Sequence, residues 1–170
     1  MHRLLLIKKL FGLLLFCFAA SSLASETILQ DFSGNAASLD DHTGKGKWLA
    51  VMYWASDCHV CNLEAKNYAA FHNRHVDSDA TILGISLDGA AGKANAEQFI
   101  KRHKLTFPNL IGEADLVALQ FTSISGDTRF GTPSFLLYNP QGELKAAQLG
   151  AVSVDKIEAY IKKNSAISTN

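Results

Sequence analysis

Two cysteines, Cys58 and Cys61, are separated by two residues in the stretch VMYWASDCHVCNLEAKNY. Cysteine thiolates coordinate metals, form disulfides and attack other sulfur atoms, so this pair fits a zinc site, a structural cross-link or a redox centre. The chain contains only one further cysteine, Cys17. The residues around the pair must therefore distinguish the three kinds of site.

The pair follows an apolar run at 47–55, of the length of a buried strand, and opens a segment at 58–75 with the apolar spacing of an amphipathic helix. Cys58 would then lie at the helix N-terminus, where free N–H groups and the helix dipole lower the pKa of a thiol from about 8.5. Cys61 would lie one turn deeper, within disulfide distance of Cys58 and too shielded to attack first. This placement predicts a reactive sulfur with a resolving partner.

The other two kinds of site fit the sequence less well. A structural zinc site requires four ligands, usually two cysteine pairs or one pair with two histidines. No second cysteine pair is present, and His72 and His75 lie 11 and 14 residues beyond Cys61, about three turns along the same expected helix. A structural disulfide is disfavoured because closing so short a loop removes little chain entropy. We therefore favour a redox centre.

The composition is that of one ordinary globular domain. The chain has 170 residues, of which 48% are hydrophobic and 19% charged, which is enough to bury a core without a metal. Its 16 basic and 16 acidic residues balance, and they form no block of like charge. This even distribution argues against a nucleic-acid partner.

Residues 1–24 have the order of a secretory signal peptide: a basic start, a short apolar core and small residues before an expected cleavage after Ala24. An uncleaved membrane anchor is the alternative, although the apolar run is shorter than the roughly 20 residues of a spanning helix. Lipidation of Cys17 is disfavoured because Phe16, not a small residue, precedes it. We expect a periplasmic protein, in a compartment where cysteine pairs oxidise.

Strands and helices are expected to alternate along the rest of the chain and to end in a hairpin and a helix. The expected strands are 26–34 and 36–44, which read as short strands or a hairpin, and 47–55, 80–88, 134–139 and 143–150. The expected helices are 58–75, 95–104, 114–121 and 153–164, with 107–112 as a connector and 121–131 as a mobile loop or surface insertion. This order predicts an α/β fold with a mixed sheet covered by helices on both faces.

Two segments resemble thioredoxin-fold proteins. WASDCHVCNLE resembles their active-site segment, in which an aromatic-Ala-x-x-Cys-x-x-Cys run ends the central strand, and GTPSFLLYNPQGEL is similar to their later cis-proline loop, strand, turn and strand. Over residues 26–163 the chain is similar to the exported TlpA/ResA-like branch of thiol–disulfide oxidoreductases, which carries a signal or anchor and an extra N-terminal hairpin. The resemblance implies a thioredoxin-like domain at 25–170.

The resemblance also implies roles for individual residues. Cys58 is the expected nucleophile and Cys61 the resolving cysteine, so the only redox group is their disulfide and no cofactor is needed. Pro133 is the expected cis-proline, and the backbone of Thr132 before it binds the substrate strand by strand addition. An ordinary trans-proline at a strand start is the alternative.

Residues next to the cysteines complete the candidate site. By resemblance, Glu64 handles the proton of the second cysteine, although a surface glutamate in the first turns of a helix explains it equally well. Trp54 and His59 are expected to contact substrate, and a protonated His59 would offset the neighbouring negative charge of Asp57. Thioredoxins hold a buried acid where this chain has Met52, which leaves Glu64 or water as the proton acceptor.

The resemblance favours a reductase of exported cysteines or disulfides, with exported proteins as substrates and a membrane thiol protein as electron donor. The Thr-Pro pair and the histidine within the motif also fit the opposite direction, an oxidase or isomerase. A peroxidase on this fold is disfavoured because Val51 and Ala55 stand where such sites require Pro and Thr. A non-catalytic module that binds partners through the cis-proline groove is the remaining alternative.

Overall fold

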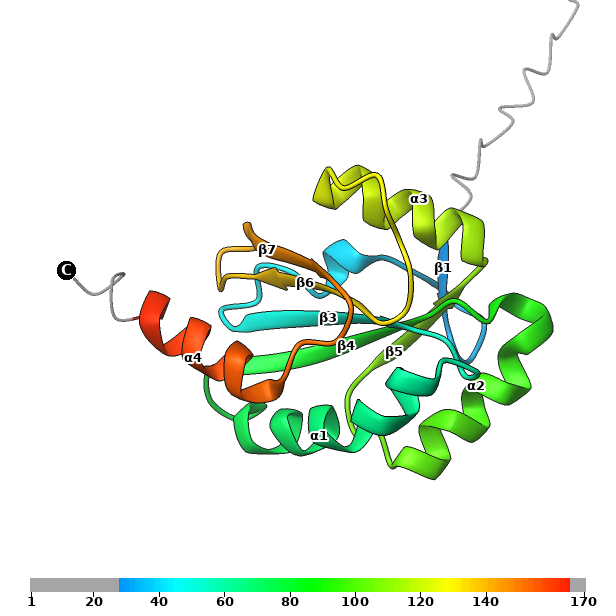
Figure 1. Ribbon diagram of the computed structural model, residues 1–170, viewed down its shortest axis with the longest axis horizontal. Helices are drawn as coiled ribbons and strands as arrows, with labels where there is room; N and C mark the ends of the chain where they lie inside the picture. The colour runs from blue at the N-terminus through cyan, green and yellow to red at the C-terminus, as the bar shows by residue number, and fades with distance from the viewer. Residues whose placement is uncertain (1–27, 166–170) are drawn as a thin grey trace, which may run out of the picture.

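The computed structural model describes residues 28–165, so the predicted signal peptide at 1–24 lies outside the described residues. Within this range the strands are β1 Leu29–Asp31, β2 Ala36–Ala37, β3 Trp48–Trp54, β4 Ala80–Ser86, β5 Asn109–Gly112, β6 Ser134–Tyr138 and β7 Leu144–Leu149. The helices are α1 His59–His75, α2 Gly89–His103, α3 Ala114–Ser125 and α4 Val154–Ser165, with a 3-10 turn, η1, at Leu39–Asp41. Figure 1 shows this arrangement.

The strands form one mixed sheet in the order β2-β1-β5-β4-β3-β6-β7. The three central strands β3, β4 and β5 are parallel, and the outer strands pair antiparallel with their neighbours. The predicted fold class, a mixed sheet with helices on both faces and additional N-terminal strands, is confirmed. Because β3 and β4 are parallel and Trp54 pairs with Ser86, the segments that follow these two strands leave the sheet at the same edge.

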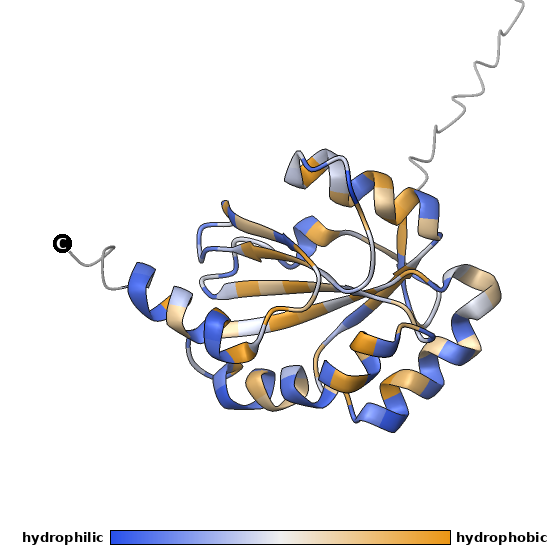
Figure 2. Cartoon of the chain, viewed as in Figure 1, coloured by the Kyte–Doolittle hydropathy of each residue, from blue (hydrophilic) through white to orange (hydrophobic). Residues whose placement is uncertain are grey.

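Side chains of β3 alternate between two apolar clusters, one on each face of the sheet. Even-numbered residues such as Met52 pack with α1, α2 and α4, and odd-numbered residues such as Val51 pack with α3, η1 and β1. In Figure 1, α1, α2 and α4 lie below the sheet and α3 lies above it. Figure 2 shows the apolar residues concentrated along the central strands. Burial on both faces explains why β3 is apolar throughout.

Three sequence-based expectations need correction. The connector at 107–112 contains β5, which is held by pairing with β4 and β1 on its two sides. Residues 36–44 contain only a two-residue strand, because Ser38 and Asp41 form a capping box that starts η1. The first part of the expected loop at 121–131 is helical, because α3 continues to Ser125. Gly126, with a left-handed backbone conformation, then ends the helix. Among residues 28–165, no helix is both long and apolar enough to cross a membrane.

Candidate active site

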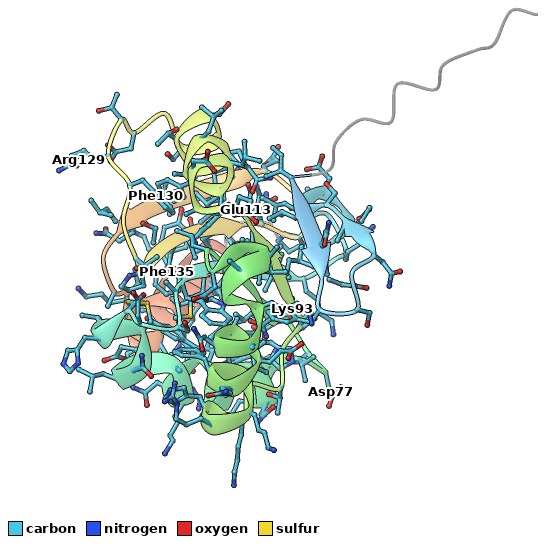
Figure 3. All side chains as sticks on the ribbon, turned by 90° about the vertical axis from the view of Figure 1, so that its right-hand side faces the viewer. Asp77, Lys93, Glu113, Arg129, Phe130 and Phe135 are labelled. Atoms are coloured by element: carbon cyan, nitrogen blue, oxygen red, sulfur yellow. A yellow bond between two sulfur atoms is a disulfide. The ribbon has the colours of Figure 1, made fainter. Side chains whose placement is uncertain are left out.

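Cys58 and Cys61 form a disulfide, with 5.2 Å between their Cα atoms. Cys58 is the N-cap residue of α1, and its Sγ accepts a hydrogen bond from the backbone N–H of Cys61 at 3.1 Å. Cys61 has no exposed surface, whereas Cys58 is half-buried. Figure 3 shows the disulfide as a yellow bond beside the first turn of α1. The more accessible sulfur thus lies where the free N–H groups of a helix stabilise a thiolate.

The turn that precedes Cys58 is anchored to the end of β4. The backbone N–H of Cys58 donates to the carbonyl of Ala55 at 3.2 Å. The carboxylate of Asp88 accepts hydrogen bonds from the Ser56 N–H at 3.1 Å, the Ser56 hydroxyl at 2.5 Å and the Ser86 hydroxyl at 2.6 Å. The common edge of β3 and β4 brings these residues together, so one carboxylate fixes the turn from the side of the neighbouring strand.

A second group of hydrogen bonds holds the same turn from the helix side. The side-chain amide of Asn62 donates to the carbonyls of Ser56 at 3.1 Å and Cys58 at 2.9 Å. The Asn62 oxygen lies 2.9 Å from Nε2 of His103, at the end of α2. Sequence reasoning missed Asn62, His103 and Asp88. They are ordinary polar residues without a diagnostic spacing, and they meet only because α1, α2 and β4 pack together.

Trp54, at the end of β3, lies in the core and not at the surface. Its ring stacks on Phe99 of α2 with 4.4 Å between centroids, and its Nε1 donates to Oδ1 of Asn109 at 3.2 Å. Because Trp54 has no exposed surface, the expectation that it contacts substrate is wrong for this structure. The alternation of β3 turns it toward the helical face, where it packs in the same cluster as Cys61.

The peptide bond between Thr132 and Pro133 is cis, as predicted. β6 begins at the next residue, Ser134, which pairs with Tyr53 near the end of β3. The cis bond and Cys58 therefore lie at the same edge of the sheet. Thr132 is half-buried, and within residues 28–165 its backbone makes no hydrogen bond. Its N–H and carbonyl are thus available to an incoming strand.

The remaining candidate residues surround the disulfide. His59 and Asp57 flank Cys58 and are exposed, so both are open to a bound molecule. Glu64 is half-buried and accepts a hydrogen bond from Nδ2 of Asn67 at 2.9 Å. Its role in proton transfer stays a prediction. Within residues 28–165, no three His, Cys, Asp or Glu side chains are placed to bind a metal ion.

The comparisons with known proteins agree with this geometry. A family model described as AhpC/TSA family matches residues 21–147. Sporulation thiol-disulfide oxidoreductase A of Bacillus subtilis is 22% identical over 120 residues, covering 70% of this chain and 69% of that protein. The thiol-disulfide oxidoreductase ResA of Oceanobacillus iheyensis is 26% identical over 147 residues, covering 84% and 69%.

Among solved structures, the thioredoxin domain of a thiol-disulfide oxidoreductase from Bacteroides vulgatus superposes with a TM-score of 0.63. It is 24% identical, and the match covers 81% of this chain and 93% of that one. These results confirm the thioredoxin fold and the resemblance to ResA-like thiol–disulfide oxidoreductases that the cysteine and proline segments indicated. The chain belongs to the AhpC/TSA family.

Proposed function

We propose that this protein is an exported thiol–disulfide oxidoreductase that reduces disulfides in other exported proteins. The observation that carries the proposal is the Cys58–Cys61 disulfide at the N-cap of α1, with the first sulfur half-buried and the second buried. A nucleophile must reach its substrate, and its resolving partner must be shielded from premature attack. This pair meets both requirements.

The reaction begins with the reduced pair. The Cys58 thiolate attacks one sulfur of a substrate disulfide, so the substrate S–S bond breaks, a mixed disulfide forms and a substrate thiolate leaves. Cys61 then loses its proton and attacks Sγ of Cys58. This step restores the Cys58–Cys61 disulfide and releases the second substrate thiolate. Two electrons pass to the substrate, and the two thiolates take up protons.

Three further residues assist these steps. Because Cys61 is buried, its proton needs an acceptor, and we assign that role to Glu64, three residues further along α1, or to water. The free backbone groups of Thr132 bind the substrate segment beside its disulfide as an added strand. The exposed His59 contacts the same segment.

Each reduction leaves the protein oxidised, so a second thiol protein must return two electrons to the disulfide. We propose a membrane-bound donor and a periplasmic location. The names of the relatives support export: one structural neighbour, 21% identical with a TM-score of 0.60, is an exposed lipoprotein thioredoxin of Streptococcus pneumoniae. The signal-peptide pattern at 1–24 supports the same location.

The opposite direction, disulfide formation or isomerisation, is the second candidate. It is favoured by His59, inside the motif, where a positive charge would stabilise the Cys58 thiolate and make the disulfide more oxidising. The equilibrium of the pair with glutathione measures the reduction potential. A value near about −120 mV would indicate an oxidant, and one well below about −200 mV a reductant.

Trapping tests the proposed chemistry directly. A Cys61→Ser variant, expressed with its signal segment, should accumulate mixed disulfides through Cys58 in the exported fraction, and mass spectrometry would identify the partners. The Cys58→Ser variant is the matched control and should trap none. If the protein is instead a non-catalytic binding module, both variants bind the same partners without a covalent link, and the proposal fails.

A further inference from the structure

We propose that Asn62 and His103 are positioning residues for the nucleophile. Together they hold the turn at 56–58, so that the Cys58 sulfur stays over the first N–H groups of α1 when the disulfide is open. The inference rests on the proposed function, because it concerns the reactivity of the reduced pair. It is carried by the hydrogen bonds from Asn62 to two carbonyls of the turn and by the contact between Asn62 and His103.

The two carbonyls fix the orientation of the Asn62 amide. The carbonyl oxygens of Ser56 and Cys58 can only accept, so the NH₂ group must face them, at 3.1 and 2.9 Å. The amide oxygen then faces Nε2 of His103 at 2.9 Å. The reverse orientation would set the amide oxygen against the two carbonyl oxygens. The Ser56 carbonyl would lose this donor, and the Cys58 carbonyl would keep only the backbone N–H of Asn62, at 3.1 Å.

This orientation also fixes the form of His103. Since the amide oxygen only accepts, Nε2 must carry a hydrogen and donate it. Nδ1 is buried and has no partner within residues 28–165, so a proton there would be unsatisfied. Burial lowers the pKa of His103, as do the charges of Arg102 and Lys66. His103 is therefore a neutral Nε2–H donor, packed against Phe99 at 4.5 Å between ring centroids.

The link matters most in the reduced protein. In the oxidised form the S–S bond itself joins Cys58 to α1, and the sulfur accepts from the Cys61 N–H at 3.1 Å. Once the bond opens, the backbone N–H of Asn62 still donates to the Cys58 carbonyl at 3.1 Å, and the Asp88 carboxylate still holds Ser56. The Asn62 side chain adds the links from the Ser56 and Cys58 carbonyls to α1 and, through His103, to α2. Without those links the Cys58 sulfur would spend time away from the N–H groups, and its thiolate would lose part of their stabilisation.

Four variants separate positioning from general stability. Asn62→Leu keeps the size of the side chain and removes all of its hydrogen bonds. His103→Gln keeps a donor close to the place of Nε2, and His103→Asn is one bond too short to reach Asn62. His72→Asn is the matched control, because His72 is also a buried histidine but lies at the far end of α1.

The rate of alkylation of Cys58 by iodoacetamide is measured against pH for each reduced protein, with mass spectrometry to identify the modified cysteine. Below the apparent pKa of the wild-type thiol, we expect Asn62→Leu and His103→Asn to react about threefold to tenfold more slowly, as loss of an ordinary hydrogen bond implies. His103→Gln and His72→Asn should stay within about twofold of the wild type.

A merely structural role would lower the unfolding midpoint of Asn62→Leu and His103→Asn and leave their alkylation profiles unchanged, and that result would overturn the proposal. If Asn62→Leu does not fold, the difference between His103→Asn and His103→Gln decides alone. A wild-type Cys58 no more reactive than free cysteine would instead defeat the proposed function, and this inference with it. A reactive wild type with unaffected variants defeats only the inference.

Discussion

Replacing Asp88 by alanine should loosen the turn before Cys58 and destabilise the whole domain. The carboxylate is the acceptor for the Ser56 N–H, the Ser56 hydroxyl and the Ser86 hydroxyl. Although Asp88 is the N-cap residue of α2, its side chain makes no capping hydrogen bond. Most of the loss can therefore be assigned to the contacts with the two serines, since the charge of Asp88 at the helix end contributes only about 0.3–1 kcal/mol.

The expected magnitude follows from these three hydrogen bonds. A hydrogen bond to a charged group contributes about 1.5–3 kcal/mol, but Ser56 and Asp88 are only half-buried, so water replaces part of the loss. We expect Asp88→Ala to lower the free energy of unfolding by about 2–4 kcal/mol. Ser56→Ala removes one hydroxyl contact and should cost about 1 kcal/mol.

Urea unfolding of the oxidised protein, followed by circular dichroism, measures both losses. Since the side chains share a hydrogen bond, the double variant should show a coupling energy of at least about 0.5 kcal/mol. Asp115→Ala, an exposed aspartate in the first turn of α3, serves as the control and should stay within about 0.5 kcal/mol of the wild type. An Asp88→Ala loss no larger than this control, or additive single losses, would refute the reasoning.

Three further predictions concern stability. Tyr53→Phe should raise the free energy of unfolding, by up to about 1 kcal/mol, because the buried Tyr53 hydroxyl has no partner within residues 28–165; a lower urea midpoint would contradict this. Gly84→Ala should lower the free energy of unfolding by about 1–3 kcal/mol, because a Cβ at this position clashes with the Asn109 side chain that accepts the hydrogen bond of Trp54. An unchanged urea midpoint would contradict this prediction. Burial lowers the pKa of His72 and His103 in the folded protein, so the unfolded chain takes up protons at a higher pH than the folded one. The free energy of unfolding should therefore fall as the pH drops below about 6.5. Urea midpoints at pH 7.5 and 5.5 test this, and the difference between them should be smaller in His72→Asn.

The position of the Cys58–Cys61 disulfide at the start of α1 could be predicted because local sequence determines it. An apolar strand followed by a helix puts Cys58 at the helix N-terminus and Cys61 one turn inside, and no distant contact is needed for that. The cis bond before Pro133 was predicted from a resemblance, and the antiparallel pairing of β6 with β3 accounts for its position at the same edge.

The supporting residues could not be predicted, because each depends on contacts between distant segments. Asn62 and His103 are 41 positions apart, and Ser56 and Asp88 are 32 apart. The expectation that Trp54 contacts substrate failed for the same reason. Its position next to the motif indicated a substrate contact, but the alternation of β3 and the packing of Phe99 place it in the core.

The pKa of the Cys58 thiol in the reduced protein tests the central claim most directly. Absorbance of the thiolate near 240 nm is followed against pH in the Cys61→Ser variant of residues 25–170, which lacks Cys17. It reports the Cys58 sulfur alone once the signal is corrected for tyrosine. Stabilisation by the amino end of α1 predicts a pKa well below the value of about 8.5 for free cysteine. A pKa at or above that value would contradict the account.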